Sequence, residues 1–290
     1  MAYENNHSNI RDYSCNSWLM KAIILAAGSS KRLGKLTEHT PKCLLSLGDK
    51  TILQHQIENL ISNGIRDIVL VTGFCEEMIK QACGSACRYI SNPLFATTNS
   101  IYSLWLAREE AREGFVVLNS DVVFHPQLLA RLLNSPCPDA LIISYHGSLG
   151  DEEMKVKVQS ERVCDISKEL NSDEAQGENV GIVKFSPQGA RVLFDKIEEL
   201  VSGGTVNAWL PLAFQKICSH YNLFAVSTDG LPWTEIDPWP VSFYNSSPGI
   251  HSNRVPRLGA SAPTRNACGG VTVGRRPTMR FFGKSGKTRK

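Results

Sequence analysis

The segment at residues 26–33 (AAGSSKRL) has the residue types of an anion-binding loop. Because its first three residues are small, the backbone N–H and C=O groups can approach a flat base or a phosphate closely. Two serines then offer hydroxyl groups, and Lys31 and Arg32 add positive charge. The pattern G-x-G-x-x-G is absent, so this is not the dinucleotide-binding fingerprint. Taken alone, the segment is equally typical of a structural turn with basic side chains.

Two further charged residues strengthen the chemical interpretation. Pro41 fixes its own φ and restricts its neighbour, so Lys42 is presented from a stiff point. Asp121 ends the apolar segment at residues 115–121 (FVVLNSD). Ligands of doubly wound sheets gather at the carboxyl ends of strands, and a carboxylate there suits a hard cation such as Mg²⁺. The alternative for Asp121 is a cap at the strand end.

The elements that must position these residues alternate between strands and helices in the first half of the chain. We expect strands at 21–27, 65–73, 88–93 and 115–124, and helices at 51–63, 75–83 and 97–112. Gly64 caps the first helix at its C-terminal end, and Thr98 or Asn99 caps the third at its start. Such alternation predicts a parallel sheet covered on both faces.

The second half of the chain has a different pattern. We expect strands at 140–146, 154–160, 162–167, 179–186 and 221–228, with helices near 187–201 and 207–219. The two halves are expected to share one core. The fold class is therefore α/β, with a Rossmann-like doubly wound mixed sheet in a single domain at residues 21–237.

The two ends of the chain have a different composition. Residues 1–20 are a polar N-terminal extension. Residues 238–290 contain ten Lys or Arg and no Asp or Glu, which leaves 21 basic against 28 acidic residues in the rest, a net charge of −7. This tail is rich in Pro, Gly, Ser and Asn, so we expect it to be disordered. Its FFGKSGKT stretch has Phe281 where a phosphate-binding loop needs Gly, so we reject that motif. Charge runs are more often solvated than bound to nucleic acid, so a nucleic-acid-binding tail is only a distant alternative.

Composition favours a soluble cytoplasmic protein. No apolar run reaches the about 18–20 residues that cross a bilayer, and residues 1–20 lack a signal peptide's apolar stretch. The nine cysteines include no C-x-x-C pair, as expected for reduced thiols. Oligomeric state is open, and a homo-oligomer is allowed.

Residues 25–33 (LAAGSSKRL), the Pro-Lys pair and the apolar segment that follows resemble the N-terminal signature of a family of nucleotidyltransferases. These enzymes attach a nucleoside monophosphate to a phosphorylated small molecule, and they include sugar-1-phosphate nucleotidylyltransferases and bacterial choline-phosphate cytidylyltransferases. The family's usual wording is L-A-A-G-x-G-x-R-L, then P-K, and Ser30 stands where the second Gly is common. The resemblance extends to about Asp237 and implies a nucleotide-diphospho-sugar transferase-like fold.

The resemblance implies roles for the charged residues. Arg32 would hold the β and γ phosphates, and Lys42 would meet the α-phosphate and the charge that develops on it. Mg²⁺ is the implied cofactor, held by Asp121 and by Asp237 of a late E-I-D segment, with Glu235 as a neighbour. The nucleotide-binding residues would be Leu25, Ala26, Ala27, Gly28, Ser29, Ser30 and Asn99.

The stretch at residues 92–107 (NPLFATTNSIYSLWLA) resembles the choline-phosphate branch and relatives that act on aminoethylphosphonate or inositol phosphate. Asn99 could reach a ligand from a helix N-terminus, which favours anions. Leu104 and Trp105 are more typical of core packing, and Tyr102 fits either the core or an acceptor pocket.

Acceptor-binding residues follow from the same resemblance. Lys168 in DISKEL matches the lysine that holds the acceptor phosphate in sugar enzymes, and Lys155 is a second candidate; each fits a solvated strand lysine equally well. A trimethylammonium head would need an aromatic cage, for which the candidates are Trp209, Trp233 and Tyr102, near Asp151, Glu152 and Glu153. Met154 stands where choline-selecting relatives have an aromatic residue, which favours a primary ammonium instead.

These observations predict a Mg²⁺-dependent nucleotidyltransferase that transfers CMP from CTP to a phosphocholine-like small acceptor. The alternatives are a sugar-1-phosphate nucleotidylyltransferase that uses UTP, GTP or dTTP, and a nucleotide-binding regulatory protein without turnover. The abrupt change after Asp237 also raises the hypothesis of a shifted reading frame, which sequencing of the transcript would test.

Overall fold

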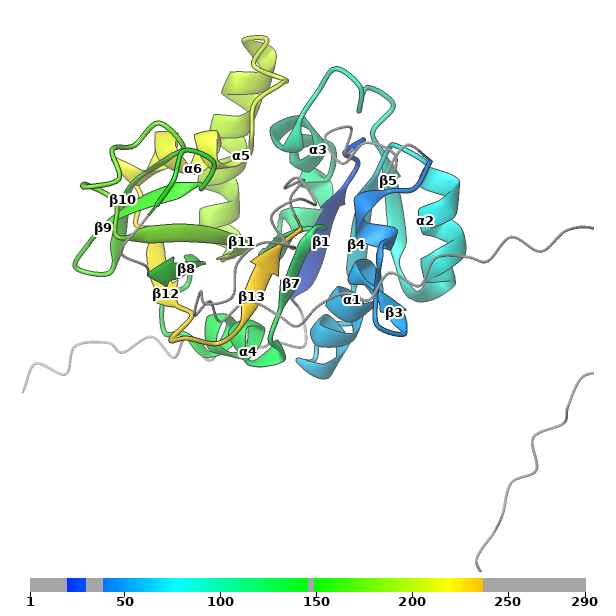
Figure 1. The fold of residues 1–290 in the computed structure, drawn as a ribbon. Coiled ribbons are helices and arrows are strands. Elements are labelled where there is room, and N and C mark those ends of the chain that lie inside the picture. The colour runs from blue at the N-terminus through cyan, green and yellow to red at the C-terminus, as the bar shows by residue number, and fades with distance from the viewer. Residues whose placement is uncertain (1–19, 30–38, 146–148, 237–290) are drawn as a thin grey trace, which may run out of the picture. The chain divides into compact units, whose positions relative to one another are not determined.

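A nine-stranded sheet forms the centre of the fold (Figure 1). The computed structural model describes residues 20–29, 39–145 and 149–236. The strand order is β5-β4-β1-β6-β11-β8-β12-β10-β9. The expected N-terminal extension and basic tail lie almost entirely outside the described residues, so the predicted domain boundaries stay predictions.

The first half of the chain forms the parallel part of the sheet. β1 (Lys21–Ala26) lies between β4 (Ile68–Thr72) and β6 (Phe115–Asn119) and is parallel to both. β5 (Arg88–Ser91) adds in parallel to β4. Because both faces of these strands are covered, β1 and β4 are almost continuously apolar rather than alternating.

The second half makes the sheet mixed. β11 (Gly177–Phe185) is antiparallel to β6 and to β8 (Ala140–Tyr145), and β12 (Phe224–Ser227) is parallel to β8. β10 (Arg162–Ser167) pairs antiparallel with β12 and with β9 (Lys155–Gln159), which also meets β11. The predicted α/β class with a mixed sheet is confirmed, and the core clusters on both of its faces contain residues from the two halves of the chain.

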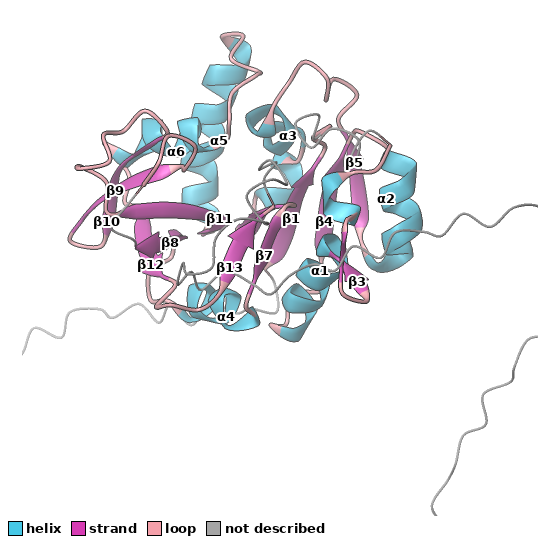
Figure 2. Ribbon diagram, viewed as in Figure 1, coloured by secondary structure: helices cyan, strands magenta, loops and turns pink. Residues whose placement is uncertain are grey.

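Helices cover both faces of the sheet (Figure 2). Ile23 and Leu25 of β1 belong to a core shared with α3 (Ser100–Leu106), α5 (Pro187–Ser202) and α6 (Pro211–Cys218). The intervening β1 residues point to the opposite core, which contains residues of α1 (Ile52–Ser62), α2 (Glu76–Cys83) and α4 (Pro126–Asn134). The alternation of side chains along one strand therefore joins the two helix layers.

Local signals fix the ends of α1. The Thr51 side chain accepts from the backbone N–H of Gln54, whose side chain accepts in return from the Thr51 N–H, as in a capping box. At the other end Gly64 adopts φ +87°, and the N–H of Ile65 returns to the carbonyl of Leu60. The predicted helix with a glycine stop is confirmed.

Other expected elements differ in extent. The helix expected at 97–112 is α3 alone, because Ala107 leaves helical geometry and a short 3-10 helix, η5 (Arg108–Ala111), follows. Asn99 is its N-cap. The strand expected at 115–124 is broken by a turn after β6, and β7 (Val122–Phe124) leaves the main sheet to pair antiparallel with β13 (Trp233–Glu235).

The structure also contains elements that the sequence did not predict. α4 is one, although His125 caps it and Pro126 occupies its first turn. β13 is another. The remaining short elements are η3 (Lys42–Leu44), β2 (Ser46–Leu47), β3 (Lys50–Thr51) and η4 (Gly84–Ala86).

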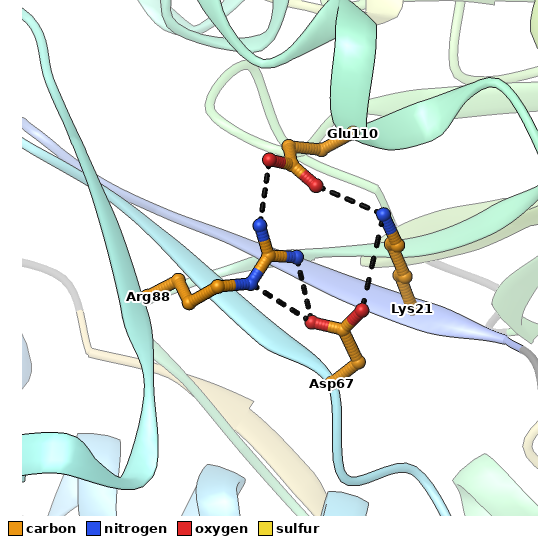
Figure 3. Close-up of polar contacts among 4 residues, drawn as sticks. All are labelled: Lys21, Asp67, Arg88 and Glu110. Atoms are coloured by element: carbon orange, nitrogen blue, oxygen red, sulfur yellow. Dashed lines mark hydrogen bonds and ion pairs between the residues drawn. The ribbon is translucent and has the colours of Figure 1, made fainter.

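A four-charge network lies at the amino ends of the parallel strands (Figure 3). The Lys21 ammonium is 2.9 Å from Glu110 Oε2 and 3.8 Å from Asp67 Oδ2. The Arg88 guanidinium completes the ring, at 2.7 Å from Asp67 Oδ1 and 2.6 Å from Glu110 Oε1. Hydrogen bonds from Arg88 and then Lys21 lower the pKa of Glu110 to about 2. The network joins β1, β5 and η5 to the start of β4.

No helix in the described part of the chain is both long enough and apolar enough to span a membrane.

Candidate active site

A pocket of about 260 Å³ opens at the carboxyl ends of β1 and β6. Its walls come from segments far apart in the sequence: residues 25–28, residues 41–43, the stretch from Asn92 to Ser103 in part, residues 119–121, Trp209 and Glu235. This is the edge of a parallel sheet where ligands are expected.

The end of β1 and the two residues that follow it form one wall. Leu25, Ala26 and Ala27 are buried, whereas Gly28 is exposed. A Cβ atom added at Gly28 would meet no atom of the described residues within 4 Å, and the φ of Gly28 lies outside the left-handed region. The described residues therefore do not require glycine here, and Gly28 lines the pocket. Ser29 is half-buried and does not line the pocket, while Ser30 and Arg32 lie outside the described residues.

The loop after β4 contacts the wall formed by residues 25–28 and holds its backbone in place. The Phe74 N–H donates to the Ala27 carbonyl at 3.1 Å. A Cβ atom at Gly73 would lie 2.9 Å from the same carbonyl oxygen and 2.6 Å from Phe95 Cβ, so only glycine allows this approach. The Ala27 carbonyl is thus already held by the protein.

Lys42 and Asp121 meet across the pocket. Lys42 begins η3 directly after Pro41, which has φ −56°. Its Nζ lies 2.8 Å from Asp121 Oδ2, with side chains 12% and 23% exposed. Two residues that are 79 positions apart in sequence, and that sequence reasoning selected separately, are therefore one ion pair.

Glu235 reaches the same place from the end of the described chain. β13 pairs with β7 so that Glu235 lies opposite Val122, and the N–H of Ile236 donates to the Asp121 backbone carbonyl at 3.0 Å. The E-I-D segment thus runs beside Asp121. Asp237 itself lies outside the described residues, and its role as a metal ligand stays a prediction.

The third wall depends on a buried asparagine that sequence reasoning did not select. Asn92 Nδ2 donates to Thr98 Oγ1 and to Ser103 Oγ, each at 3.1 Å, while its Oδ1 accepts from the Leu94 N–H. These bonds shape the loop that leads to Asn99, which lines the pocket and caps α3. Because α3 has only seven residues, its end offers less to an anion than the sequence suggested.

Trp209 lines another side of the pocket. It is held by the start of α3, since Ser100 Oγ accepts from the Leu210 N–H at 2.8 Å. The Lys168 ammonium lies 4.9 Å from the Trp209 ring centroid and 3.1 Å from Glu152 Oε2. Lys155 is 2% exposed and donates to the Lys168 carbonyl at 2.6 Å, so it supports the Lys168 turn. Neither lysine lines the pocket itself, and Lys168 reaches it only through its contact with Trp209.

Two aromatic candidates lie elsewhere. The Tyr102 ring stacks on the Trp105 ring, with centroids 5.3 Å apart. Trp233, the first residue of β13, packs against the core on the side of α1 and α4. Neither lines the pocket, so the cage of three aromatic residues does not form here. Leu104 is fully buried, as expected.

Four other residues of the pocket were not selected from the sequence. Asn119, Ser120, Phe95 and Cys43 also line the pocket. Burial raises the pKa of the Cys43 thiol to about 12, so it is neutral beside Lys42. The N-S-D run at the end of a strand could have indicated Asn119 and Ser120.

The donor chemistry around Asp121 fits a hard divalent cation. Asp121 already binds one cation, the Lys42 ammonium, and Glu235 adds a second carboxylate to the pocket. Among the described residues no group of three or more His, Cys, Asp or Glu is arranged to hold a metal. One or two carboxylates suit Mg²⁺, which completes its shell with water and substrate phosphates.

Comparison with known proteins gives one family. The model of the MobA-like NTP transferase domain matches residues 22–214. Choline-phosphate cytidylyltransferase of Streptococcus pneumoniae is 39% identical over 108 residues, which cover 36% of this chain and 46% of that protein. CTP:phosphoglutamine cytidylyltransferase of Campylobacter jejuni is 26% identical over 244 residues, covering 75% of this chain and 96% of that protein.

A solved structure agrees with the sequence comparison. CTP:phosphocholine cytidylyltransferase from Streptococcus pneumoniae aligns with a TM-score of 0.65 at 25% identity, covering 78% of this chain and 96% of that one. The nucleotidyltransferase fold expected from the sequence is confirmed.

Proposed function

Because the chain belongs to the MobA-like NTP transferase family, we propose that it transfers CMP from CTP to a small phosphorylated acceptor and releases pyrophosphate. The observation that carries the proposal is the Lys42–Asp121 pair, set in one pocket beside the small-residue end of β1.

The pocket offers complementary surfaces to a nucleoside triphosphate. The open space at Gly28 allows the base or ribose to approach the backbone of residues 26–28. A triphosphate carries about four negative charges. Lys42 is the described ammonium on the pocket wall. Arg32, which lies outside the described residues, would hold the β and γ phosphates.

The reaction then requires alignment and charge neutralisation. An oxygen of the acceptor phosphate attacks the α-phosphorus, a new P–O bond forms, and the bond to the β-phosphate oxygen breaks to release pyrophosphate. The attacking oxygen is already ionised near neutral pH, so no general base is needed. Lys42 would leave Asp121 for the α-phosphate oxygens, where charge develops in the transition state.

Mg²⁺ would neutralise phosphate charge and bring the triphosphate into line. Asp121 and Glu235, with Asp237 beyond the described residues, would hold it. The departure of the Lys42 ammonium frees the Asp121 carboxylate for that role.

The choice of CTP rests on the relatives, since both compared proteins bear cytidylyltransferase names. The acceptor phosphate would enter beside Trp209, with Lys168 as its counter-charge. Because the Lys168 ammonium already lies over the Trp209 ring, that ring is a poor partner for a trimethylammonium group. An acceptor with a carboxylate would pair with Lys168 here, and one with a primary ammonium would need Glu152, which lies 3.1 Å from Lys168, as its counter-charge.

The test is a matrix of nucleotides and acceptors, with pyrophosphate release as the readout. The nucleotides are CTP, UTP, GTP and dTTP; the acceptors are phosphocholine, phosphoethanolamine, aminoethylphosphonate, a phosphorylated amino acid and hexose 1-phosphates. Turnover with CTP and a small phospho-acceptor supports the proposal. Turnover only with a sugar phosphate and another nucleotide contradicts the substrate choice, and nucleotide binding without any turnover contradicts the activity.

A further inference from the structure

The turn that carries Asp121 is tied to helix α1 by one side chain. This turn, residues 119–122, joins β6 to β7 and is called the Asp121 turn below. Gln56 Nε2 donates to the Asn119 carbonyl at 2.8 Å and to the Val122 carbonyl at 2.7 Å. One amide therefore satisfies the first and the last carbonyl of the turn, on either side of Asp121.

Gln56 is an unusual residue for its location. It lies on the core side of α1 and is 1% exposed. Within the described part of the chain, its Oε1 is the buried side-chain polar atom that has no hydrogen-bond partner. A buried unsatisfied acceptor is costly, and an apolar side chain would avoid that cost. An apolar side chain would, however, leave both turn carbonyls without these donors.

The other contacts of the Asp121 turn come from different directions. The Ile236 N–H donates to the Asp121 backbone carbonyl, and Lys42 pairs with its carboxylate. The first contact depends on the late strand β13, and the second would be broken when Lys42 turns to a substrate phosphate. Gln56 makes its contact from α1, an 11-residue helix that begins with a capping box and is independent of both β13 and Lys42.

We propose that Gln56 is a positioning residue that fixes the Asp121 turn so that the carboxylate can accept a divalent cation when Lys42 leaves it. This inference rests on the proposed function, and it concerns a residue that touches neither substrate nor metal. Outer contacts of this kind orient ligating carboxylates, and their removal commonly weakens metal binding or activity by about 10–100-fold.

The decisive variant is Gln56→Met, which keeps the volume of the buried side chain and removes both N–H donors. Mn²⁺ binding, measured by electron paramagnetic resonance with CTP present and no acceptor, should weaken at least about tenfold. The value of kcat should fall by a similar factor, while the KM for the acceptor stays within about twofold. Gln56→Asn keeps the amide but is too short to reach both carbonyls, and it should fall between wild type and Gln56→Met.

Asn59→Leu is the matched control. Asn59 lies on the same face of α1, and its Nδ2 donates to the Phe124 carbonyl at 3.1 Å, three residues beyond Asp121. Loss of the Asn59 hydrogen bond should lower thermal stability about as much as Gln56→Met does. It should leave Mn²⁺ affinity and kcat unchanged.

The outcomes separate the two proposals. If Gln56→Met loses stability like Asn59→Leu but binds Mn²⁺ as tightly as wild type, Gln56 is merely structural and the inference is overturned. If Gln56→Met does not fold, Gln56→Asn decides by the same criteria. If wild-type protein neither binds Mn²⁺ with CTP nor turns over, the proposed function fails, and the inference fails with it.

Discussion

The charge network at the amino ends of the strands allows a quantitative prediction from Glu110→Gln. This substitution keeps the shape of the side chain and removes the negative charge that Arg88 and Lys21 share. It lies at the opposite ends of the strands from the pocket, so it tests the fold without changing the proposed chemistry.

The magnitude follows from the pKa of Glu110. Lowering it from 4.5 to about 2 on folding corresponds to about 3 kcal/mol. The Arg88 side chain is 49% exposed, so solvent screening reduces the expected contribution to about 1–2 kcal/mol. Because the folded pKa is the lower one, this stability is present above about pH 4.5 and is lost as the pH falls towards about 2.

Urea unfolding at a series of pH values measures the effect. Glu110→Gln should lower the free energy of unfolding by about 1–2 kcal/mol at pH 7, and the difference from wild type should shrink below about pH 4.5. Glu109→Gln is the neighbouring control, since it removes only an exposed pair with Arg112 and should cost less than about 0.5 kcal/mol. Equal effects of the two substitutions, or a difference that does not depend on pH, would refute this reasoning.

Three further substitutions test separate parts of the structure. Gly28→Ala should leave the free energy of unfolding unchanged or slightly raised and weaken CTP binding about tenfold by calorimetry, because the new Cβ meets no atom of the described residues and Gly28 lines the pocket. Unchanged CTP affinity would contradict the pocket assignment. Gly189→Ala should cost about 2 kcal/mol or more in urea unfolding, because its Cβ would overlap the buried Asp139 carboxylate; a neutral result would show that α5 shifts freely. Lys168→Met should raise the KM for the acceptor and leave that for CTP unchanged; the reverse pattern would remove Lys168 from the acceptor side.

Much of the fold followed from local patterns. The apolar run of β1 and the capping residues of α1 determine those elements within a few residues. The prediction failed where tertiary contacts decide. The segment at 115–124 has the composition of one strand, but β7 turns away to pair with β13, more than 100 residues later.

In the candidate site, too, residues marked by local sequence could be predicted, whereas those whose role depends on tertiary contacts could not. Lys42 and Asp121 could be selected separately because one follows a rigid proline and the other ends a strand, and the sheet then brings them together. Gln56 could not be selected, because its role depends on carbonyls 63 and 66 residues away. Asn92 was missed for a related reason, since a buried asparagine that shapes a loop has the same sequence signal as one in a surface turn.

The most direct test of the central claim is ³¹P nuclear magnetic resonance of the protein with CTP and the best acceptor, for wild type, Lys42→Met and Lys50→Met. Lys50 pairs with Glu58 at the surface and serves as the matched lysine control. Wild type and Lys50→Met should form pyrophosphate and a CMP-linked product in equal amounts, with Lys42→Met slower by about 10²–10³-fold. Turnover in Lys42→Met at the wild-type rate, or CTP breakdown that gives no acceptor-linked product, would contradict the account.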